Sequence, residues 1–197
     1  MSYIQTLEKI LDSKDPTAGG SAAAAMAGAM ACGLIGMTAR LSTMKCYGLE
    51  DRQYLELADE LDEISFKLLR GVQEDNKAYG EICSAMKLPK ETEDEKIART
   101  AAIEKAGVRA LEIMRDNGLL CKKVHRISMM LKDNSDSNAA ADLAVGSALA
   151  DAGAKGCAGG IKADLSLVSD PEIARQFRED MEKILEEEKY YIGERQH

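Results

Sequence analysis

An aspartate on a predicted helix is the side chain in this sequence best suited to proton transfer. From Glu50 to Met86 the chain has no proline, and apolar residues recur at helical spacing. Asp75 is three residues after Val72 and four before Tyr79, so it lies on the apolar face of this helix. Burial disfavours the charged carboxylate and raises its pKa, which suits a general acid or base. The alternative is a structural aspartate held by a helix terminus or an arginine.

A glycine pair followed by a serine gives a second candidate site. Gly19, Gly20 and Ser21 stand where a helix of residues 21–42 is predicted to begin. The backbone N–H groups at a helix start are unpaired, and no bulky side chain stands in front of them, so they could bind a polar or anionic ligand. The alternative is a simple turn, with Ser21 or Thr17 capping the helix.

Asp142, like Asp75, lies on the same face as apolar residues, here in a later helix predicted for residues 139–157. It shares a face with Val145, Leu149 and Gly153. It also stands in the first turn, where a carboxylate is stabilised by unpaired N–H groups. Asp142 is therefore either a site residue or a residue that only stabilises the helix start.

Composition excludes several other kinds of site. With two histidines and five cysteines, none in a C-x-x-C pair, the sequence predicts no metal site. The odd cysteine number indicates reduced thiols and a cytoplasmic protein. A net charge of −8 argues against a nucleic-acid partner, which would require a basic surface.

The elements that position these residues are all predicted to be helices. Only 4% of the 197 residues are aromatic and three are proline, which is typical of neither a sandwich nor a barrel. We expect one domain over residues 1–197, an antiparallel bundle of six or seven helices. We expect a turn or kink at 116–118, a loop at 133–138, a helix end at 159–160, and a helix opened by Ser169-Asp170-Pro171. Residues 161–168 are the one weak strand candidate. The predicted helices cover residues 2–12, 21–42, 50–86, 92–115, 119–132, 139–157 and the segment from 171 onward.

The helix of residues 21–42 is predicted to be the centre of this bundle. Residues 16–39 carry no charge, yet they have too little Leu, Ile, Phe and Val for a typical membrane span, so we expect no membrane partner. A helix with one small and one bulky face is expected to have neighbours on both sides, although the small face could instead meet its copy in a dimer. The small face consists of Gly20, Ala24, Gly28, Cys32 and Gly36. The bulky face consists of Met26, Met30, Leu34, Met37, Leu41 and Met44.

Four segments, in order along nearly the whole chain, resemble the C-terminal family of formiminotransferase-cyclodeaminases. Residues 16–23, PTAGGSAA, resemble its P-x-G-G-G-S-[AV]-A opening, and residues 75–79, DNKAY, resemble its D-x-x-A-[FY]. Residues 88–96, LPKETEDEK, resemble L-P-K-x-T-x-E-E-K. Residues 138–142, NAAAD, resemble N-x-x-S-D.

This resemblance implies a dimeric helical enzyme that acts on a tetrahydrofolate derivative, with no further cofactor. Family members close 5-formiminotetrahydrofolate to the 5,10-methenyl form with loss of ammonia, or hydrolyse the methenyl form to 10-formyltetrahydrofolate. It implies that Asp75 is the general acid or base. It further implies that Gly19, Gly20, Ser21, Asn138 and Asp142 bind substrate.

The chain also departs from the family pattern. Ala18 replaces the first glycine of the opening, and Ala141 replaces the serine before Asp142. Gly160 and Asp164 stand where the family usually has two asparagines, and Asp164 adds a charge. The sequence therefore leaves open which reaction is catalysed, and a protein that binds folate without turnover, or an assembly protein of the same fold, is the alternative.

Overall fold

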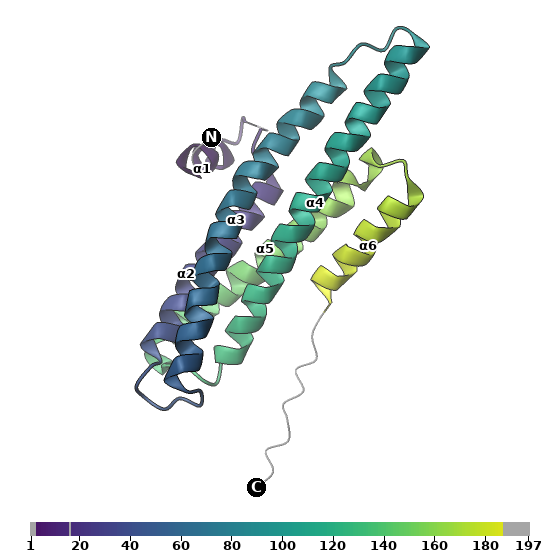
Figure 1. Cartoon of the computed structure of the whole chain (residues 1–197). Helices are drawn as coiled ribbons and strands as arrows, with labels where there is room; N and C mark the ends of the chain where they lie inside the picture. The colour runs from purple at the N-terminus through teal and green to yellow at the C-terminus, as the bar shows by residue number, and fades with distance from the viewer. Residues whose placement is uncertain (1–2, 16, 187–197) are drawn as a thin grey trace.

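The computed structural model describes residues 3–15 and 17–186, and all regular structure in these residues is helical (Figure 1). This confirms the prediction of an all-α protein. The weak strand candidate at 161–168 is wrong, because a helix and then a 3₁₀ turn occupy it. The α-helices are α1 (Tyr3–Leu11), α2 (Gly20–Leu41), α3 (Asp51–Met86), α4 (Glu93–Leu131), α5 (Ala140–Asp164) and α6 (Pro171–Leu185). The 3₁₀ turns are η1 (Ser137–Ala139) and η2 (Leu165–Leu167).

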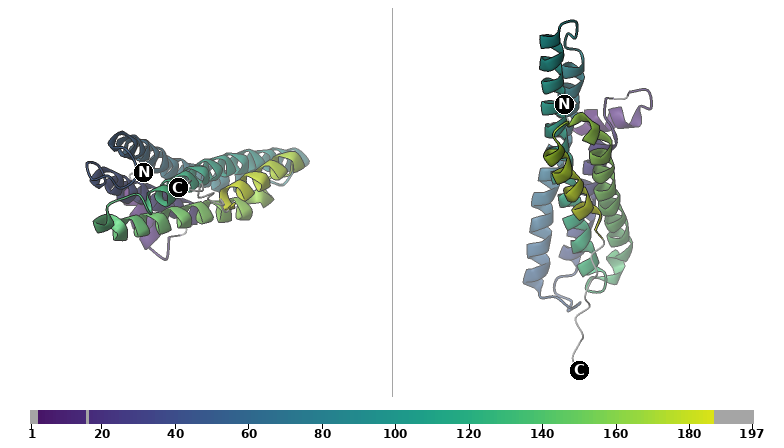
Figure 2. Two further views of the ribbon diagram at one scale, coloured as in Figure 1. Left: turned by 90° about the horizontal axis from the view of Figure 1, so that it is seen from below. Right: turned by 90° about the vertical axis from the view of Figure 1, so that its right-hand side faces the viewer.

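Helices α2 to α5 form an antiparallel bundle in which α2 packs on α3 and α5, and α4 packs on the same two helices (Figures 1 and 2). Helix α1 lies beside α3, and α6 covers α4 and α5. The far ends of α3 and α4 project beyond the other helices as a hairpin. The start of α2 and the end of α5 therefore meet α3 part-way along its length.

The small face of α2 is the buried one. Gly28 packs against Leu68 of α3 and Cys121 of α4, since a Cβ on Gly28 would lie 2.5 Å from Cys121 Sγ. On α5, a Cβ on Gly153 would lie 2.8 Å from the carbonyl oxygen of Ala24. Small residues thus let three helix backbones approach closely around α2. The small face is inside the chain, so it does not face a second copy.

The bulky face of α2 is exposed in the single chain, which corrects the prediction that this helix is covered on both sides. Met30, Met37 and Leu41 are 56%, 41% and 52% exposed. Among the described residues α2 is the one helix long and apolar enough to cross a membrane, and 61% of its most apolar window is buried inside the bundle.

Helix α4 runs without interruption through Asp116, Asn117 and Gly118, where a turn was predicted. The local turn preference is overridden by packing. Asn117 is buried against Gly71 of α3, and a Cβ on Gly118 would lie 2.7 Å from Ile184 of α6.

Helix α5 likewise continues through Gly159 and Gly160 to Asp164, so the predicted helix end is wrong. Gly160 is needed as a small residue, because a Cβ there would lie 2.4 Å from Met114 Sδ of α4. The predicted starts of α4 and α6 are confirmed. Thr92 and Glu95 form the capping box of α4, and Asp170 caps α6 ahead of Pro171.

Candidate active site

Asp75 lies part-way along α3, on its buried face, as its spacing predicts. It is 8% exposed, and it accepts a hydrogen bond of 2.8 Å on Oδ2 from Ser21 Oγ of α2. No ion pair to Asp75 is present among the described residues, so it is not the arginine-bound structural aspartate considered above. The carboxyl is held by a neutral hydroxyl and enclosed by helices.

Ser21 does not cap α2, although a capping role for Ser21 or Thr17 was predicted. The N-cap residue is Gly19, which has extended backbone and makes no side-chain cap. The hydroxyl of Ser21 is directed to Asp75 instead, and Thr17 bonds Asp15. A tertiary hydrogen bond to a buried carboxyl has replaced the local cap.

Gly19 and Gly20 bring the start of α2 to the site without blocking it. A Cβ on either glycine would meet nothing within 4 Å, so both face open space. A helix start of this kind leaves room for a ligand beside Ser21. The structure thus places three of the predicted binding residues together with Asp75. Pro16, which begins the same sequence motif, lies outside the described residues.

The end of α5 completes this cluster. A Cβ on Gly160 would lie 3.8 Å from Ser21 Cβ, and Asp164 is one turn further along α5. Asp164 is an unusual charge in the sequence, but a helix that ends before Gly159, as predicted, would not bring it here. The continuation of α5 through Gly159 and Gly160 is the feature that the sequence pattern did not predict.

Both carboxyls have raised pKa values. Burial is the largest cause for Asp75, the charge of Asp164 raises its pKa further, and the hydrogen bond from Ser21 opposes them. Burial raises the pKa of the half-buried Asp164 as well. A carboxyl whose pKa is raised can gain and lose a proton closer to neutral pH, which is what acid–base chemistry needs.

Asn138 and Asp142 lie at the opposite end of the bundle from Asp75. Asn138 precedes α5 and donates from its backbone N and Nδ2 to Asp136 Oδ1, both at 2.9 Å. Asp142 is half-buried in the first turn of α5. Along α5 it is separated from Gly160 by about 27 Å, at a rise of 1.5 Å per residue. Within one chain these two residues cannot join Asp75.

The same end of the bundle holds Lys45, close to Asp136. Its Nζ lies 2.7 Å from Asp136 Oδ2. The hydrogen bond from Lys45, with one from the backbone of Asn138, lowers the pKa of Asp136 to about 2. Lys45 therefore pairs with a permanently charged aspartate of its own chain. Lys90 stands between α3 and α4 at the tip of their hairpin.

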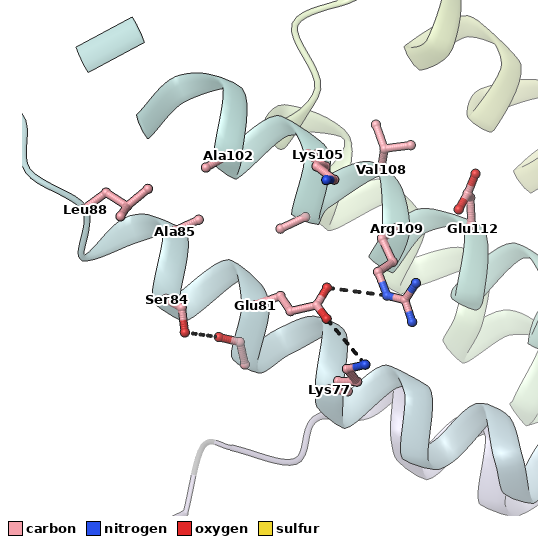
Figure 3. A pocket seen from close by; sticks show the side chains of 12 residues that line it. Lys77, Glu81, Ser84, Ala85, Leu88, Ala102, Lys105, Val108, Arg109 and Glu112 are labelled. Atoms are coloured by element: carbon pink, nitrogen blue, oxygen red, sulfur yellow. Dashed lines mark hydrogen bonds and ion pairs between the residues drawn. The ribbon is translucent and has the colours of Figure 1, made fainter. Parts of the chain in front are cut away.

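A groove of about 910 Å³ runs between α3 and α4 (Figure 3). Glu81 lies across it from Arg109, with Glu81 Oε2 3.4 Å from Arg109 Nε, and Glu81 Oε1 lies 4.0 Å from Lys77 Nζ. Lys77 follows Asp75 by two residues, so it projects from a nearly opposite face of α3. The groove is thus separate from the Ser21–Asp75 cluster.

Comparison with known proteins gives consistent matches over almost the whole chain. The family model described as formiminotransferase-cyclodeaminase matches residues 3–183. A methenyltetrahydrofolate cyclohydrolase of Methylorubrum extorquens is 29% identical over 191 residues, which are 95% of this chain and 92% of that protein. The crystal structure of a formiminotetrahydrofolate cyclodeaminase from Thermotoga maritima superimposes with a TM-score of 0.80 at 21% identity. The match covers 94% of this chain and 88% of the other.

Proposed function

Because the chain belongs to the formiminotransferase-cyclodeaminase family, we propose that it is a folate one-carbon enzyme that uses Asp75 as its general acid and base. The observation that carries the proposal is the buried Asp75, hydrogen-bonded only to Ser21 among the described residues and beside the open start of α2. The reaction we favour is hydrolysis of 5,10-methenyltetrahydrofolate, since the relative from M. extorquens bears that name.

The chemistry fits one carboxyl that exchanges a proton. Water adds to the methenyl carbon as the Asp75 carboxylate takes one of its protons. The bond from that carbon to N5 then breaks, N5 receives the proton from Asp75, and the carbon remains on N10 as a formyl group. Of the two protons of water, one ends on N5 and the other is released to solvent. The methenyl group is a cation, and a site with two carboxyls and no described cation suits it.

Cyclodeamination of 5-formiminotetrahydrofolate is the second candidate, because the same carboxyl can serve it. N10 attacks the formimino carbon and loses its proton to Asp75, and the departing nitrogen gains that proton and a second one from solvent to leave as ammonia. The segments that resemble the family are common to both reactions. A protein that binds folate without turnover is the remaining alternative.

The test is the ultraviolet absorption of the methenyl chromophore in the presence of the purified protein. A hydrolase makes the absorption of added methenyltetrahydrofolate disappear faster than its spontaneous loss in the same buffer. A cyclodeaminase makes the absorption appear from 5-formiminotetrahydrofolate. Absence of both changes, with folate binding retained in a calorimetric titration, would establish the non-catalytic alternative.

We also propose that the protein is a homodimer joined through the exposed apolar face of α2 and α5. Met30, Met37 and Leu41 of α2 and Val145 of α5 are large apolar residues exposed in the single chain. Between Gly20 and Ala39 α2 carries no charge. A continuous apolar face on a bundle helix is the kind of surface that a second copy covers. If the two copies of α2 run antiparallel, the Asn138–Asp142 end of one copy lies near the Ser21–Asp75 end of the other.

Met37→Glu is expected to convert the dimer into monomers. A carboxylate placed in an apolar contact loses its hydration without gaining a partner. Sedimentation equilibrium should report twice 21.4 kDa for the wild type and a single 21.4 kDa chain for the variant. Met130→Glu is the matched control, because Met130 on α4 is 45% exposed against 41% for Met37. A dimer that persists in Met37→Glu would place the contact elsewhere.

A further inference from the structure

Asp164 stands next to the proposed general acid and base because α5 continues past two glycines. At Gly160 the helix lies close to α4, since a Cβ there would lie 2.4 Å from Met114 Sδ. The turn that contains Gly160 lies against Ser21, and Asp164 follows one turn later on the same side of α5. The end of α5 that carries Asp164 thus lies beside the start of α2, where Ser21 holds the Asp75 carboxyl.

This arrangement provides fewer hydrogen-bond donors than the two carboxyls can accept from. Ser21 has one hydroxyl proton, and it is donated to Asp75 Oδ2. The neighbouring side chains from α4 at this level are Met114 and Asn117, which carry no charge. A pair of nearby, partly desolvated carboxyls without a counter-ion cannot ionise independently.

The other groups that face this region do not offset the charge of Asp164. From α1, Thr6 contacts the neutral Asn76 next to Asp75 on α3. One turn along α3 the titratable group is Tyr79, whose pKa is raised most by Cys83 and least by Asp15. The cation Lys9 near these groups is paired with Asp15, with Lys9 Nζ 3.9 Å from Asp15 Oδ2. Within the described part of the chain, Asp164 is the one charged group that acts on Asp75.

We propose that Asp164 and Asp75 work as a pair in which the charge of the ionised Asp164 makes the Asp75 carboxylate a stronger base, so that Asp164 is a positioning residue for the proton that Asp75 takes up and returns in the proposed folate reaction. The less buried Asp164 loses its proton first, since its charge is better hydrated. Asp75 then gives up its proton only at higher pH. Asp164 acts through Asp75 and need not contact substrate. This inference rests on the proposed function for its catalytic meaning, but the pairing itself is a property of the free protein.

The test is a titration of the Asp75 carboxyl carbon by ¹³C NMR in the substrate-free protein. In Asp164→Asn, which keeps the side-chain shape, the midpoint of Asp75 should move to lower pH. In Ser21→Ala, which removes the bond that favours the charged form, it should move to higher pH. Asp151→Asn is the control on the same helix, since Asp151 pairs with Lys155 and its loss should leave the midpoint unchanged.

The pH–rate profile is the second readout. The limb of kcat/KM that belongs to Asp75 should move to lower pH in Asp164→Asn by the same amount as the NMR midpoint. An unchanged Asp75 midpoint in Asp164→Asn would overturn the pairing, whether or not the protein turns over folate. A shifted midpoint in a protein without folate turnover would support the pairing and reject the proposed function, so the two failures are distinguishable.

Discussion

Asp75→Asn is expected to lower folate turnover by about 10²–10⁴-fold, which is the typical contribution of a general acid or base. The asparagine keeps the size of the side chain, and its oxygen can still accept the hydrogen bond from Ser21. It cannot take a proton from water or deliver one to N5. Substrate binding should survive, because the start of α2 and the end of α5 are unchanged.

The stability of the same variant has a defined pH dependence. Burial raises the pKa of Asp75 above its unfolded value of 3.8. Between the pKa of Asp75 in the unfolded chain and its higher pKa in the folded protein, the folded state holds more protons than the unfolded state. Wild-type stability therefore falls as pH rises through that window. Asparagine does not titrate, and the variant should lose less stability over the same window. The melting temperature of Asp75→Asn minus that of the wild type should therefore increase with pH through this window. Above the pKa of Asp75 in the folded protein the difference should stay constant.

The two measurements together separate a catalytic from a structural aspartate. Turnover and melting temperature are measured on one preparation of Asp75→Asn, with Asp151→Asn as the control. Normal turnover in folded variant protein would remove Asp75 from the mechanism. A large loss of stability with normal activity in the surviving fraction would indicate a structural role.

Gly153→Val is expected to destabilise the bundle by about 1–3 kcal/mol, the usual cost of overpacking a core. A Cβ at this position lies 2.8 Å from the backbone oxygen of Ala24 and 2.8 Å from Cys121 Sγ. The backbone oxygen cannot rotate away, so α5 must move from α2, and the close contact of the two helices is lost. The melting temperature should fall by about 2–12 °C, at about 2–4 °C per kcal/mol for a chain of this size.

Gly80→Val serves as the control for this prediction. Gly80 is in the interior of α3, away from the apolar face of α2 and α5, and its Cβ would meet nothing within 4 Å. Valine there should change the unfolding free energy by no more than about 0.5 kcal/mol, since its helix propensity is slightly better than that of glycine. Equal melting temperatures for the two variants would show that α2 and α5 are not held by close contact.

The sequence alone determined the fold class and the position of Asp75. Both depend on local information, because a long helix without proline repeats its buried face every three to four residues. The spacing from Val72 to Tyr79 is enough to direct Asp75 inward, whatever α3 packs against. The capping box of Thr92 and Glu95 is local in the same sense, since both partners lie within one turn.

The tertiary structure decided where helices ended and which residues met. Asn117-Gly118 and Gly159-Gly160 have the composition of breaks, yet α4 and α5 pass through them because small side chains are needed where neighbouring helices touch. A window of sequence cannot show this, since the contacts come from residues far along the chain.

The partners of Asp75 were decided in the same way. Ser21 was a plausible cap by its local position, but a carboxyl 54 residues away takes its hydrogen bond. Asp164 reaches the site only because α5 does not stop, and Asp142 lies away from it because α5 begins at the other end of the bundle. Motif order along the chain carries no information about which end of an antiparallel bundle a residue occupies. That assignment follows from helix lengths and packing, which only the folded chain fixes.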